Sequence, residues 1–510
     1  MTRARVGRAL TLAAALAAAA ACAGAPATDP AYITVAVPSS PNSFDPRVGT
    51  DEVSQRVYQL VYDNLFNLDD RLRVSPGLAT GWETPDDRTY VVHLRDGVTF
   101  HDGQAFDADD VVYTFGSLID PEFLSARKGA YRMLERVEAL DARTVRFTLS
   151  EPFGSFPINL VLPIVPDGAG AGLRDTPVGT GPYRFVRYAV DDRLELARFD
   201  GYWQGAARNA GLVLKVVPDD IMRGLELRKG TVDLVINDLA PDIVFQLEED
   251  DALQVVHSPG TDYAYVGFNL RDPLLADVRV RQAIGYAIDR DAIVAHLRRG
   301  LARPAAGILP DISWAFEPAV FQFTYDPARA RQLLDEAGYP DPDGDGPAPR
   351  LHLTLKVSTN EFIRLQAAVI QQDLRAVGIE LDVRSYEFAT LYADVLRGQF
   401  QLFTLQWVGV SDPDMLRRVF HSSQMPPTGF NRGHYRNPEV DQLIDRATVA
   451  TDDATRREAY GAAQRLIAEE APYISLWYKT NVAVAQPGIE GLRLSPSADF
   501  SALRHVSRAR

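Results

Sequence analysis

The sequence contains one cysteine, Cys22, in 510 residues, so no intramolecular disulfide can form and a thiolate-rich metal site is excluded. It also lacks any cluster of lysine and arginine, and its formal net charge is −15 at pH 7. Because nucleic-acid binding relies on such basic clusters, we expect no nucleic-acid partner. Beyond the first 21 residues, the sequence has no apolar run long enough to span a bilayer.

The motifs that mark common catalytic sites are absent as well. We find no Gly-x-Ser-x-Gly, no His-Glu-x-x-His and no phosphate-binding Gly-x-x-x-x-Gly-Lys. The segment SARK at 125–128 matches the Ser-x-x-Lys motif of penicillin-interacting enzymes, but the companion motifs Ser-Asp-Asn and Lys-Thr-Gly are missing. The sequence therefore predicts a protein that is not an enzyme and that uses no cofactor.

The N-terminus has the organisation of an export signal. Three arginines within the first eight residues precede an apolar run over residues 9–21, and Cys22 follows directly. This pattern is typical of a secretory signal peptide, and without a twin arginine the general secretory route is expected. A lone cysteine after small residues resembles a bacterial lipobox. We therefore predict a signal peptide over 1–21, lipidation of Cys22, a tether over 22–30, and a periplasmic or cell-envelope location with a lipid anchor in the membrane.

Strand and helix patterns are mixed along the rest of the chain. Strands are predicted where apolar and polar residues alternate, at 32–38, 88–94 and 143–150. Helices are predicted where apolar residues recur at the helical period, at 278–297, 361–378 and 453–471. The mixture predicts α/β domains, and the length of the chain predicts two to four of them.

The stretch LRDGVTFHDGQAFDADDVVYTF at 94–115 gathers five aspartates and one histidine, which raises the question of a metal or catalytic site. Two of the acids, Asp107 and Asp110, fit the N-cap and the first turn of a helix. Two others stand in Asp-Gly pairs, which are typical of turns. Only His101 remains, and no second histidine stands at ligand spacing. We interpret the stretch as structural, with a metal or catalytic site as the alternative.

Five segments carry a family resemblance when they are taken in order. They are SPGLATGWETPDDRTYVVHLRDGVTFHDGQAFDADDVVYTF, PVGTGPYRFVRY, FNLRDPLLADVRVRQAIGYAIDRDAIV, VGIELDVRSYEFATLYADVLRGQFQLFTLQWVGVSDPD and EEAPYISLWY. They resemble the family 5 extracellular solute-binding proteins, the peptide, dipeptide and nickel receptors of ABC importers. The likeness covers nearly the whole chain after the signal.

The resemblance implies a fold and a function. The expected fold is an α/β, two-lobed, periplasmic-binding-protein-like structure of type II, with an extra inserted domain and a ligand cleft between the lobes. Its expected parts are domain I at 31–50, 179–270 and 480–510, domain II at 51–178, and domain III at 271–479. The implied function is an extracytoplasmic receptor, expected to be a monomer, that captures a small solute and delivers it to ABC permease subunits in the membrane.

The nature of the solute stays open at this stage. A peptide is the first hypothesis, and a nickel chelate, another metal chelate or another non-peptide solute is the second. A third hypothesis, from a different class, is a structural or chaperone-like envelope lipoprotein without a ligand. Lobe closure that depends on a ligand would distinguish the receptor from that third class.

The resemblance also implies where a ligand would bind. The cleft would be lined by PNSFDPRVGTDE, which contains Phe44, and by the loop WVGVSDPD, in which Trp407 forms a cavity wall. In peptide-binding members, an aspartate three residues after this tryptophan pairs with the amino terminus of the ligand. This sequence has Val410 there, and Asp412 is the nearest alternative carboxylate. Since a buried ammonium needs a partner, a peptide held in the usual way is in doubt.

The segment that follows, FHSSQMPPTGFNRGHYRNPEVDQL, supplies further candidates. We predict ligand contacts for His421, Asn431 and Arg432, the last because a guanidinium binds a carboxylate through two parallel hydrogen bonds. Our prediction includes no metal ligands. A nickel or copper site built from His421, Met425 and His434 is an alternative hypothesis, and an exposed loop without a ligand role is another.

Overall fold

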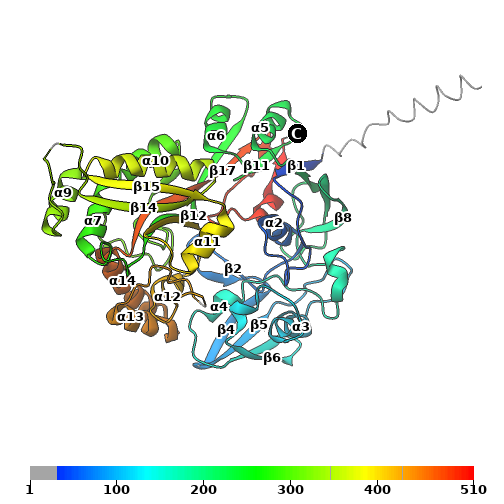
Figure 1. The fold of residues 1–510 in the computed structure, drawn as a ribbon. Coiled ribbons are helices and arrows are strands. Elements are labelled where there is room, and N and C mark those ends of the chain that lie inside the picture. Colours follow the sequence, from blue (N-terminus) through cyan, green and yellow to red (C-terminus); the bar gives the residue numbers. More distant parts are fainter. Residues whose placement is uncertain (1–30, 345, 428, 510) are drawn as a thin grey trace, which may run out of the picture.

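The computed structural model describes residues 31–344, 346–427 and 429–509. The expected signal peptide, Cys22 and the tether lie outside the described residues. Two lobes stand side by side and share one long sheet (Figure 1). Within the described part of the chain, no helix is long and apolar enough to cross a membrane.

The main sheet has eleven strands and runs through both lobes. Its order is β15-β14-β16-β12-β17-β11-β1-β10-β9-β8, and β13 pairs with β17 off this path. The strands are β1 (Tyr32–Val37), β8 (Tyr183–Ala189), β9 (Arg193–Arg198), β10 (Gly211–Val216), β11 (Leu234–Ile236), β12 (Gln254–Phe268), β13 (Ala302–Pro304), β14 (Leu351–Ser358), β15 (Ile379–Tyr386), β16 (Leu402–Trp407) and β17 (Tyr473–Ala485). Parallel pairs, such as β14 with β15, and antiparallel pairs, such as β12 with β17, occur together, as expected for a mixed α/β sheet.

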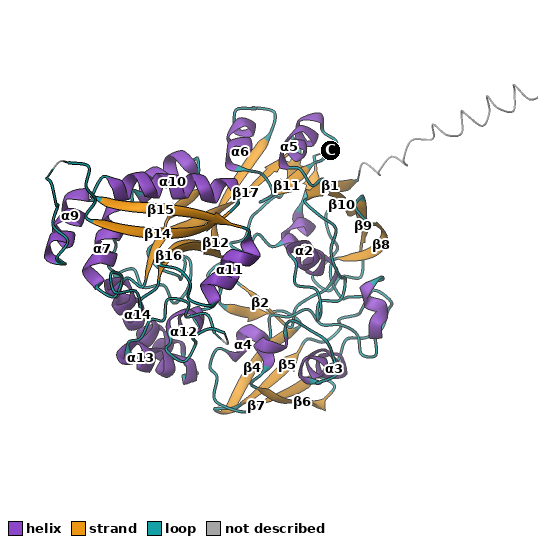
Figure 2. Ribbon diagram, in the orientation of Figure 1, coloured by secondary structure: helices purple, strands orange, loops and turns teal. Residues whose placement is uncertain are grey.

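A second sheet of four strands has the order β4-β5-β7-β6, and Figure 2 shows it grouped with α3 (Ala108–Ile119) and α4 (Phe156–Asn159). Its strands are β4 (Ala79–Asp86), β5 (Thr89–Leu94), β6 (Leu134–Asp141) and β7 (Thr144–Leu149). In β5 and β7 every second side chain is buried, so both strands predicted from alternation are confirmed. Two short pairs complete the strands, β2 (Phe66–Leu68) with β3 (Val74–Pro76) and β18 (Ile489–Glu490) with β19 (Ser507–Arg508).

The remaining helices pack against the two sheets or against one another. They are α2 (Glu52–Val61), α5 (Asp220–Lys229), α6 (Pro241–Glu248), α7 (Val278–Ala287), α8 (Arg290–Ala292), α9 (Pro327–Glu336), α10 (Glu361–Arg375), α11 (Phe388–Leu396), α12 (Met415–Phe420), α13 (Pro438–Val449) and α14 (Asp453–Glu470), with short 3₁₀ segments at Lys128–Tyr131, Gly170–Arg174 and Phe500–His505. The helices predicted at 361–378 and 453–471 correspond to α10 and α14 and are confirmed.

The single helix predicted over 278–297 is wrong, because the chain leaves the helical conformation at Ile288. α7 ends at Ala287, and Ile288 has an extended ψ of 119°. Asp289 then caps a new turn, since its carboxylate accepts the backbone N–H of Ala292 at 2.8 Å. An aspartate favours such a cap over a helix interior, and the apolar period alone did not reveal the break.

The aspartate-rich stretch at 94–115 has a structural role, as predicted. Asp107 and Asp110 form a reciprocal capping box at the start of α3. His101 is half-buried, and its Nε2 lies 3.0 Å from the carbonyl oxygen of Gly181 while its Nδ1 accepts the N–H of Gly179 at 3.3 Å. Burial lowers the pKa of His101, so the imidazole is neutral. It connects the loop after β5 to the turn before β8, and so links the four-stranded sheet β4–β7, which we call the small sheet, to the main sheet.

Strands β12 and β17 connect the two lobes. Residues 254–259 of β12 pair with residues 480–485 of β17, and residues 263–267 pair with 473–478. Between these two ladders the register shifts at a β-bulge around Gly260–Asp262. A bulge increases the local twist and bends the strand, so the ladder changes direction where the chain passes from one lobe to the other.

Candidate ligand-binding site

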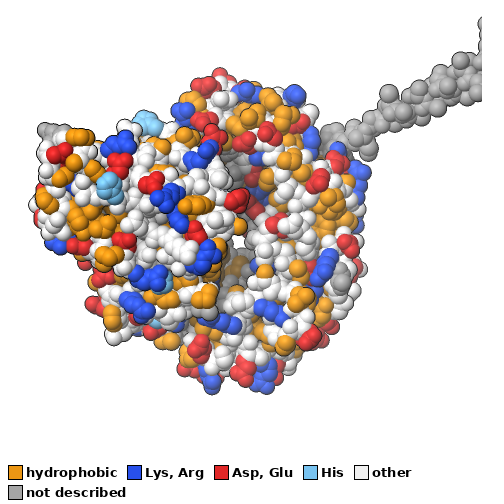
Figure 3. All heavy atoms as spheres, in the orientation of Figure 1, with side chains coloured by type: hydrophobic (Ala, Val, Ile, Leu, Met, Phe, Trp, Pro, Cys, Tyr) orange, Lys and Arg blue, Asp and Glu red, His pale blue; other side chains and the backbone are white. Residues whose placement is uncertain are grey.

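A hollow separates the two lobes on the face shown in Figure 3. Figure 1 shows α11 at the edge of one lobe and α2 at the facing edge of the other. The lobe that carries α11 also contains β14–β16 and the α12–α14 helices, and we call it the large lobe. The elements on either side of the hollow determine which side chains a solute would meet.

An aromatic–arginine wall stands on the large lobe, formed by Tyr265, Tyr392, Trp407, Phe430 and Arg432. β16 ends at Trp407, whose ring meets the ring of Phe430 edge-on at a centroid distance of 5.5 Å. The guanidinium of Arg432 lies 4.6 Å from the centroid of the Trp407 ring and 5.2 Å from that of Tyr392. Such stacking holds a cation firmly in place, and the flat rings offer contact area at a small entropic cost.

Arg432 is a buried cation without an acidic partner. It is 4% exposed, and none of the ion pairs among the described residues includes it. Its guanidinium donates to the phenol oxygens of Tyr265 at 2.9 Å and Tyr392 at 3.3 Å. Its Nε and the Nε1 of Trp407 are buried donors with no hydrogen-bond partner. A buried guanidinium with a spare donor is suited to an anionic group, because a carboxylate offsets its desolvation.

The loop after β16 is anchored to the bulge in β12. The N–H of Gly409 donates to the carboxylate of Asp262 at 2.9 Å, and the N–H of Val410 donates to the carbonyl of Thr261 at 3.2 Å. Val410 is 2% exposed and belongs to an apolar core with Leu416. The side chain at position 410 therefore points into the large lobe, where a charged group would be costly.

The segment after β1 on the opposite lobe is held by two tyrosine hydroxyl groups, one in α2 and one directly after its end. Tyr58 donates to the carbonyl of Ser43 at 2.8 Å, and Tyr62 donates to the carbonyl of Phe44 at 2.9 Å. Phe44 is 3% exposed and packs edge-on against Phe185 at 5.8 Å. The backbone of this segment is thus fixed by hydrogen bonds, while the Phe44 side chain lies in the core.

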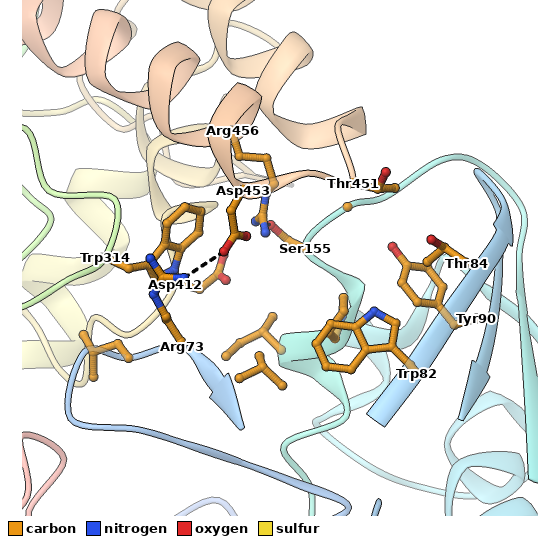
Figure 4. Close-up of a pocket in the computed structure, with 15 residues that line it drawn as sticks. Arg73, Trp82, Thr84, Tyr90, Ser155, Trp314, Asp412, Thr451, Asp453 and Arg456 are labelled. Atoms are coloured by element: carbon orange, nitrogen blue, oxygen red, sulfur yellow. Dashed lines mark hydrogen bonds and ion pairs between the residues drawn. The ribbon is translucent and has the colours of Figure 1, made fainter. Parts of the chain in front are cut away.

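Asp412 lies in a pocket of about 200 Å³ at the seam between the small sheet and the large lobe (Figure 4). Burial raises its pKa, and the charge of Arg456 opposes that rise. The neighbouring Asp414 is 5% exposed, and burial together with the charge of Asp412 raises its pKa to about 7. This pocket differs from the aromatic–arginine wall in both its residues and its charges.

The other candidates from the loop after α12 have local partners. Asn431 is 1% exposed and donates to the carbonyls of Phe420, His421 and Tyr435, so it holds the loop together. The Nε2 of His421 lies 3.2 Å from the carboxylate of Asp445.

The two histidines of the alternative metal hypothesis have different neighbours. His434 lies at another pocket, where burial and the charges of Arg271 and Arg436 lower its pKa. His421 faces carboxylates instead, so the two imidazoles have different surroundings. Among the residues that the structure describes, no group of three or more His, Cys, Asp or Glu side chains is placed to hold a metal ion.

Sequence reasoning did not include Tyr265, Tyr392, Phe430 or Phe388 among the candidates. Phe388 is 55% exposed and stacks on Tyr392 at 5.9 Å, one turn along α11. That spacing of two aromatic residues was a usable signal for an exposed aromatic face. Tyr265 carried no local signal, because it lies on a buried strand and meets Arg432 only through the fold.

The fold and the wall define a class of protein: a two-lobed α/β receptor that holds a solute between its lobes. Comparison with known proteins supports this class. Residues 73–426 match the profile of the bacterial extracellular solute-binding proteins, family 5 (middle region). The glutathione-binding protein GsiB of Pectobacterium atrosepticum is 33% identical over 491 residues, with 92% of each chain covered.

Solved structures show the same likeness. The ABC transporter substrate-binding protein CtaP of Listeria monocytogenes superposes with a TM-score of 0.84 and 26% identity, covering 94% of this chain and 99% of that one. The oligopeptide-binding protein AppA of Bacillus subtilis, in complex with a nonapeptide, has a TM-score of 0.74 and 27% identity, with 94% and 99% covered.

The chain belongs to the family 5 extracellular solute-binding proteins. It is therefore an extracytoplasmic solute-binding receptor of an ABC importer and not an enzyme. The two-lobed α/β fold expected from the sequence is confirmed.

Proposed function

We propose that this receptor captures a small peptide with a free carboxylate, of the glutathione class, and presents it to the permease. The observation that carries the proposal is Arg432, a buried guanidinium of the large lobe that has no acidic partner and lies over the ring of Trp407. The relative named a glutathione-binding protein supports the same class. A ligand carboxylate would accept from Arg432 and compensate its burial.

The charge of the ligand is part of the proposal. Glutathione has two carboxylates and one ammonium group, so it carries a net negative charge at neutral pH. An unmodified dipeptide has one of each and relies on a carboxylate of the receptor for its ammonium group. Val410 is buried in the core at the position where peptide-binding members carry that carboxylate. The wall therefore favours an anionic peptide over a zwitterionic one.

An ordinary peptide is the second candidate, because AppA, at 27% identity, was solved with a nonapeptide. A longer peptide would place its terminal ammonium group away from position 410 and contact the exposed rings of Phe388 and Phe430. The nickel-chelate alternative is supported by NikZ of Campylobacter jejuni, which was solved with Ni(L-His) and has 25% identity and a TM-score of 0.77. The ligand-free alternative has no comparable observation in its favour.

Isothermal titration of the mature protein tests the proposal, after unfolding and refolding to remove any retained solute. The titrants are glutathione, its α-linked isomer Glu-Cys-Gly, trialanine, a nonapeptide mixture and a nickel–histidine chelate. We expect a Kd at or below about 10 μM for glutathione and at least tenfold weaker binding of trialanine. Tighter binding of trialanine or of the nonapeptides than of glutathione would contradict the glutathione class, and binding of the nickel chelate alone would select the metal alternative.

The attachment to the membrane is also a proposal. The sequence pattern supports a signal peptide over 1–21, a lipidated Cys22 and a tether over 22–30, which place the receptor at the cell envelope as a lipid-anchored monomer. Labelling with radioactive palmitate in the native host tests the anchor. Label that is incorporated by the natural chain and lost in Cys22→Ala supports it, and equal labelling of both contradicts it. Light scattering after size exclusion tests the monomer.

The division into domains stands as a proposal with the boundaries given above. The expected limit at 479/480 falls inside β17, beside the change of register opposite Gly260–Asp262. Amide hydrogen exchange with and without ligand tests this boundary. A change of exchange at the bulge would locate the hinge there, and unchanged exchange at the bulge would place the hinge elsewhere.

A further inference from the structure

We propose that the pocket at the seam between the small sheet and the large lobe is a second binding site, for a free α-amino acid with an apolar side chain. This seam pocket has a volume of about 200 Å³, which suits a molecule of that size. Its defining residues are Trp82, Tyr90, Ser155, Trp314, Asp412 and Arg456 (Figure 4). The proposal is independent of the solute that binds at the aromatic–arginine wall.

The apolar part of the seam pocket is built from aromatic rings on both sides. Trp82, on β4, and Tyr90, on β5, stand on one side, and Trp314 of the large lobe stands on the other (Figure 4). Trp82 is 37% exposed, whereas Trp314 is 8% exposed. Leu72 and Ile158 complete the apolar lining. Rings on two sides with aliphatic groups between them accommodate an apolar side chain.

The cationic part of the pocket is Arg456. It is 8% exposed, lies over the ring of Trp314 at 5.1 Å and donates from Nη2 to the Oγ of Ser155 at 2.5 Å. Its Nε has no hydrogen-bond partner, and no ion pair among the described residues includes it. A buried guanidinium that has no ion pair and one free N–H donor can bind the carboxylate of a ligand through hydrogen bonds.

The anionic part is Asp412, which lines the same pocket. One of its oxygens accepts the N–H of Asp414 at 2.7 Å. Arg73 and Asp453 form an ion pair of 2.9 Å at the rim, so their charges are matched with each other. The pocket therefore offers one guanidinium and one carboxylate, which complement the carboxylate and the ammonium group of an amino acid.

The seam around the pocket is closely packed. The N–H of Gly154 donates to the carbonyl of Thr448 at 2.7 Å, and the N–H of Trp314 donates to the carbonyl of Arg71 at 3.1 Å. A side chain at position 154 would overlap the carbonyl oxygen of Ala450. A space several times the volume of one water molecule, about 30 Å³, is therefore a distinct feature of this seam.

An occupant would link the two lobes. Since the pocket walls come from both sides of the seam, the complete site exists only when the small sheet lies against the large lobe. A ligand that contacts both walls favours that arrangement by its differential affinity. A free amino acid would then act as a second ligand that assists closure.

Tryptophan fluorescence of the mature full-length protein tests the site, with leucine as the probe. We expect saturable binding with a Kd below about 1 mM, and at least tenfold weaker binding of N-acetyl-leucine and of leucinamide, each of which lacks one charge. Trp82→Ala, a change at a partly exposed position, is expected to weaken leucine binding at least tenfold. Arg456→Gln is expected to do the same if it folds, which circular dichroism checks.

The matched control is Arg432→Met, which alters the aromatic–arginine wall. This variant is expected to lose the main solute and to bind leucine with unchanged affinity. Absence of saturable leucine binding up to about 10 mM would overturn the proposal. So would leucine binding that is lost in Arg432→Met and kept in Trp82→Ala, because leucine would then occupy the hollow. Neither result depends on whether glutathione binds.

Discussion

The backbone N–H of Gly409 lies 2.9 Å from a carboxylate oxygen of Asp262, and this bond joins the loop after Trp407 to the bulge of β12. The second oxygen of Asp262 accepts from the side chain of Gln406 at 3.0 Å. The ligand wall and the strand crossing between the lobes are therefore in direct contact. A rearrangement of the bulge on closure would move the loop, and ligand binding at the loop would bias the bulge.

Asp262→Ala removes the acceptor for both bonds. We expect the loop after β16 to lose its fixed position and the affinity for the main solute to fall about tenfold, with a loss of about 1–3 kcal/mol in the free energy of unfolding. Asp262→Asn is the matched control, since its amide oxygen still accepts from Gly409. Calorimetric titration and urea unfolding measure the two effects, and equal affinities of Asp262→Ala and the natural chain would refute the coupling.

Arg432→Met is expected to weaken binding of an anionic solute by about 10- to 100-fold, because hydrogen bonds to charged groups contribute about 1.5–3 kcal/mol. Its Tm is expected to fall slightly, since the hydrogen bond to Tyr265 and the cation–π contact with Trp407 are lost. Arg432→Lys keeps the charge and is expected to retain part of the affinity. An unchanged Kd in Arg432→Met would exclude the guanidinium from the site.

Gly154→Ala is expected to separate the small sheet from the large lobe. The added methyl group overlaps the carbonyl oxygen of Ala450, a backbone atom that has no rotamer to change. The radius of gyration from small-angle X-ray scattering should increase, and leucine binding at the seam pocket should be lost. Gly129→Ala, in the 3₁₀ segment Lys128–Tyr131 and with open space around it, serves as the control. Identical scattering of both variants would show that the seam tolerates the methyl group.

The stability of the protein is expected to depend on the protonation of Asp414. Burial, with the charge of Asp412, raises its pKa to about 7 in the folded state, while an aspartate in an unfolded chain titrates near 4. Between these values the folded protein holds a proton that the unfolded chain has released. The free energy of unfolding therefore falls as the pH rises through this interval, by at most about 1.4 kcal/mol per pH unit.

Asp414→Asn tests this dependence, because the amide does not titrate. Urea unfolding at pH 5, 7 and 8 measures the free energy of unfolding of both proteins. As the pH rises, this free energy should fall in the natural chain relative to the variant, and the difference should become constant above the pKa of Asp414 in the folded state. Asp109→Asn, at an exposed acid in the first turn of α3, is the control. A constant difference between Asp414→Asn and the natural chain across this range would show that Asp414 is ionised throughout.

Local patterns predicted much of the fold. The strands β5 and β7 and the capping box at Asp107 follow from alternation and from acids at a helix start, which act over a few residues. The break at Ile288 was missed, because the apolar period continues through it and only the cap preference of Asp289 opposed a helix. Tertiary packing, which the sequence pattern does not contain, decides between a continuous helix and a break at this point.

The candidate site was less accessible from the sequence. Trp407 and Arg432 were both named as ligand candidates, but their contact depends on how the loop after α12 returns to the end of β16. Phe44 stands in a segment that borders the hollow, yet its side chain packs against Phe185, and nothing in the sequence distinguishes the two directions. Side-chain direction at a loop is determined by tertiary neighbours, which a single sequence does not supply.

The central position of β17 has a consequence for biogenesis. β17 comes near the end of the chain, yet it lies between β12 and β11 and joins the two halves of the main sheet. During synthesis, the edges of β11 and β12 that pair with β17 therefore stay unpaired until the last part of the chain emerges from the ribosome. A polypeptide that must be threaded through a membrane channel before it folds benefits from this delay. Strand order thus delays closure of the main sheet until β17 is available, which suits the export proposed above.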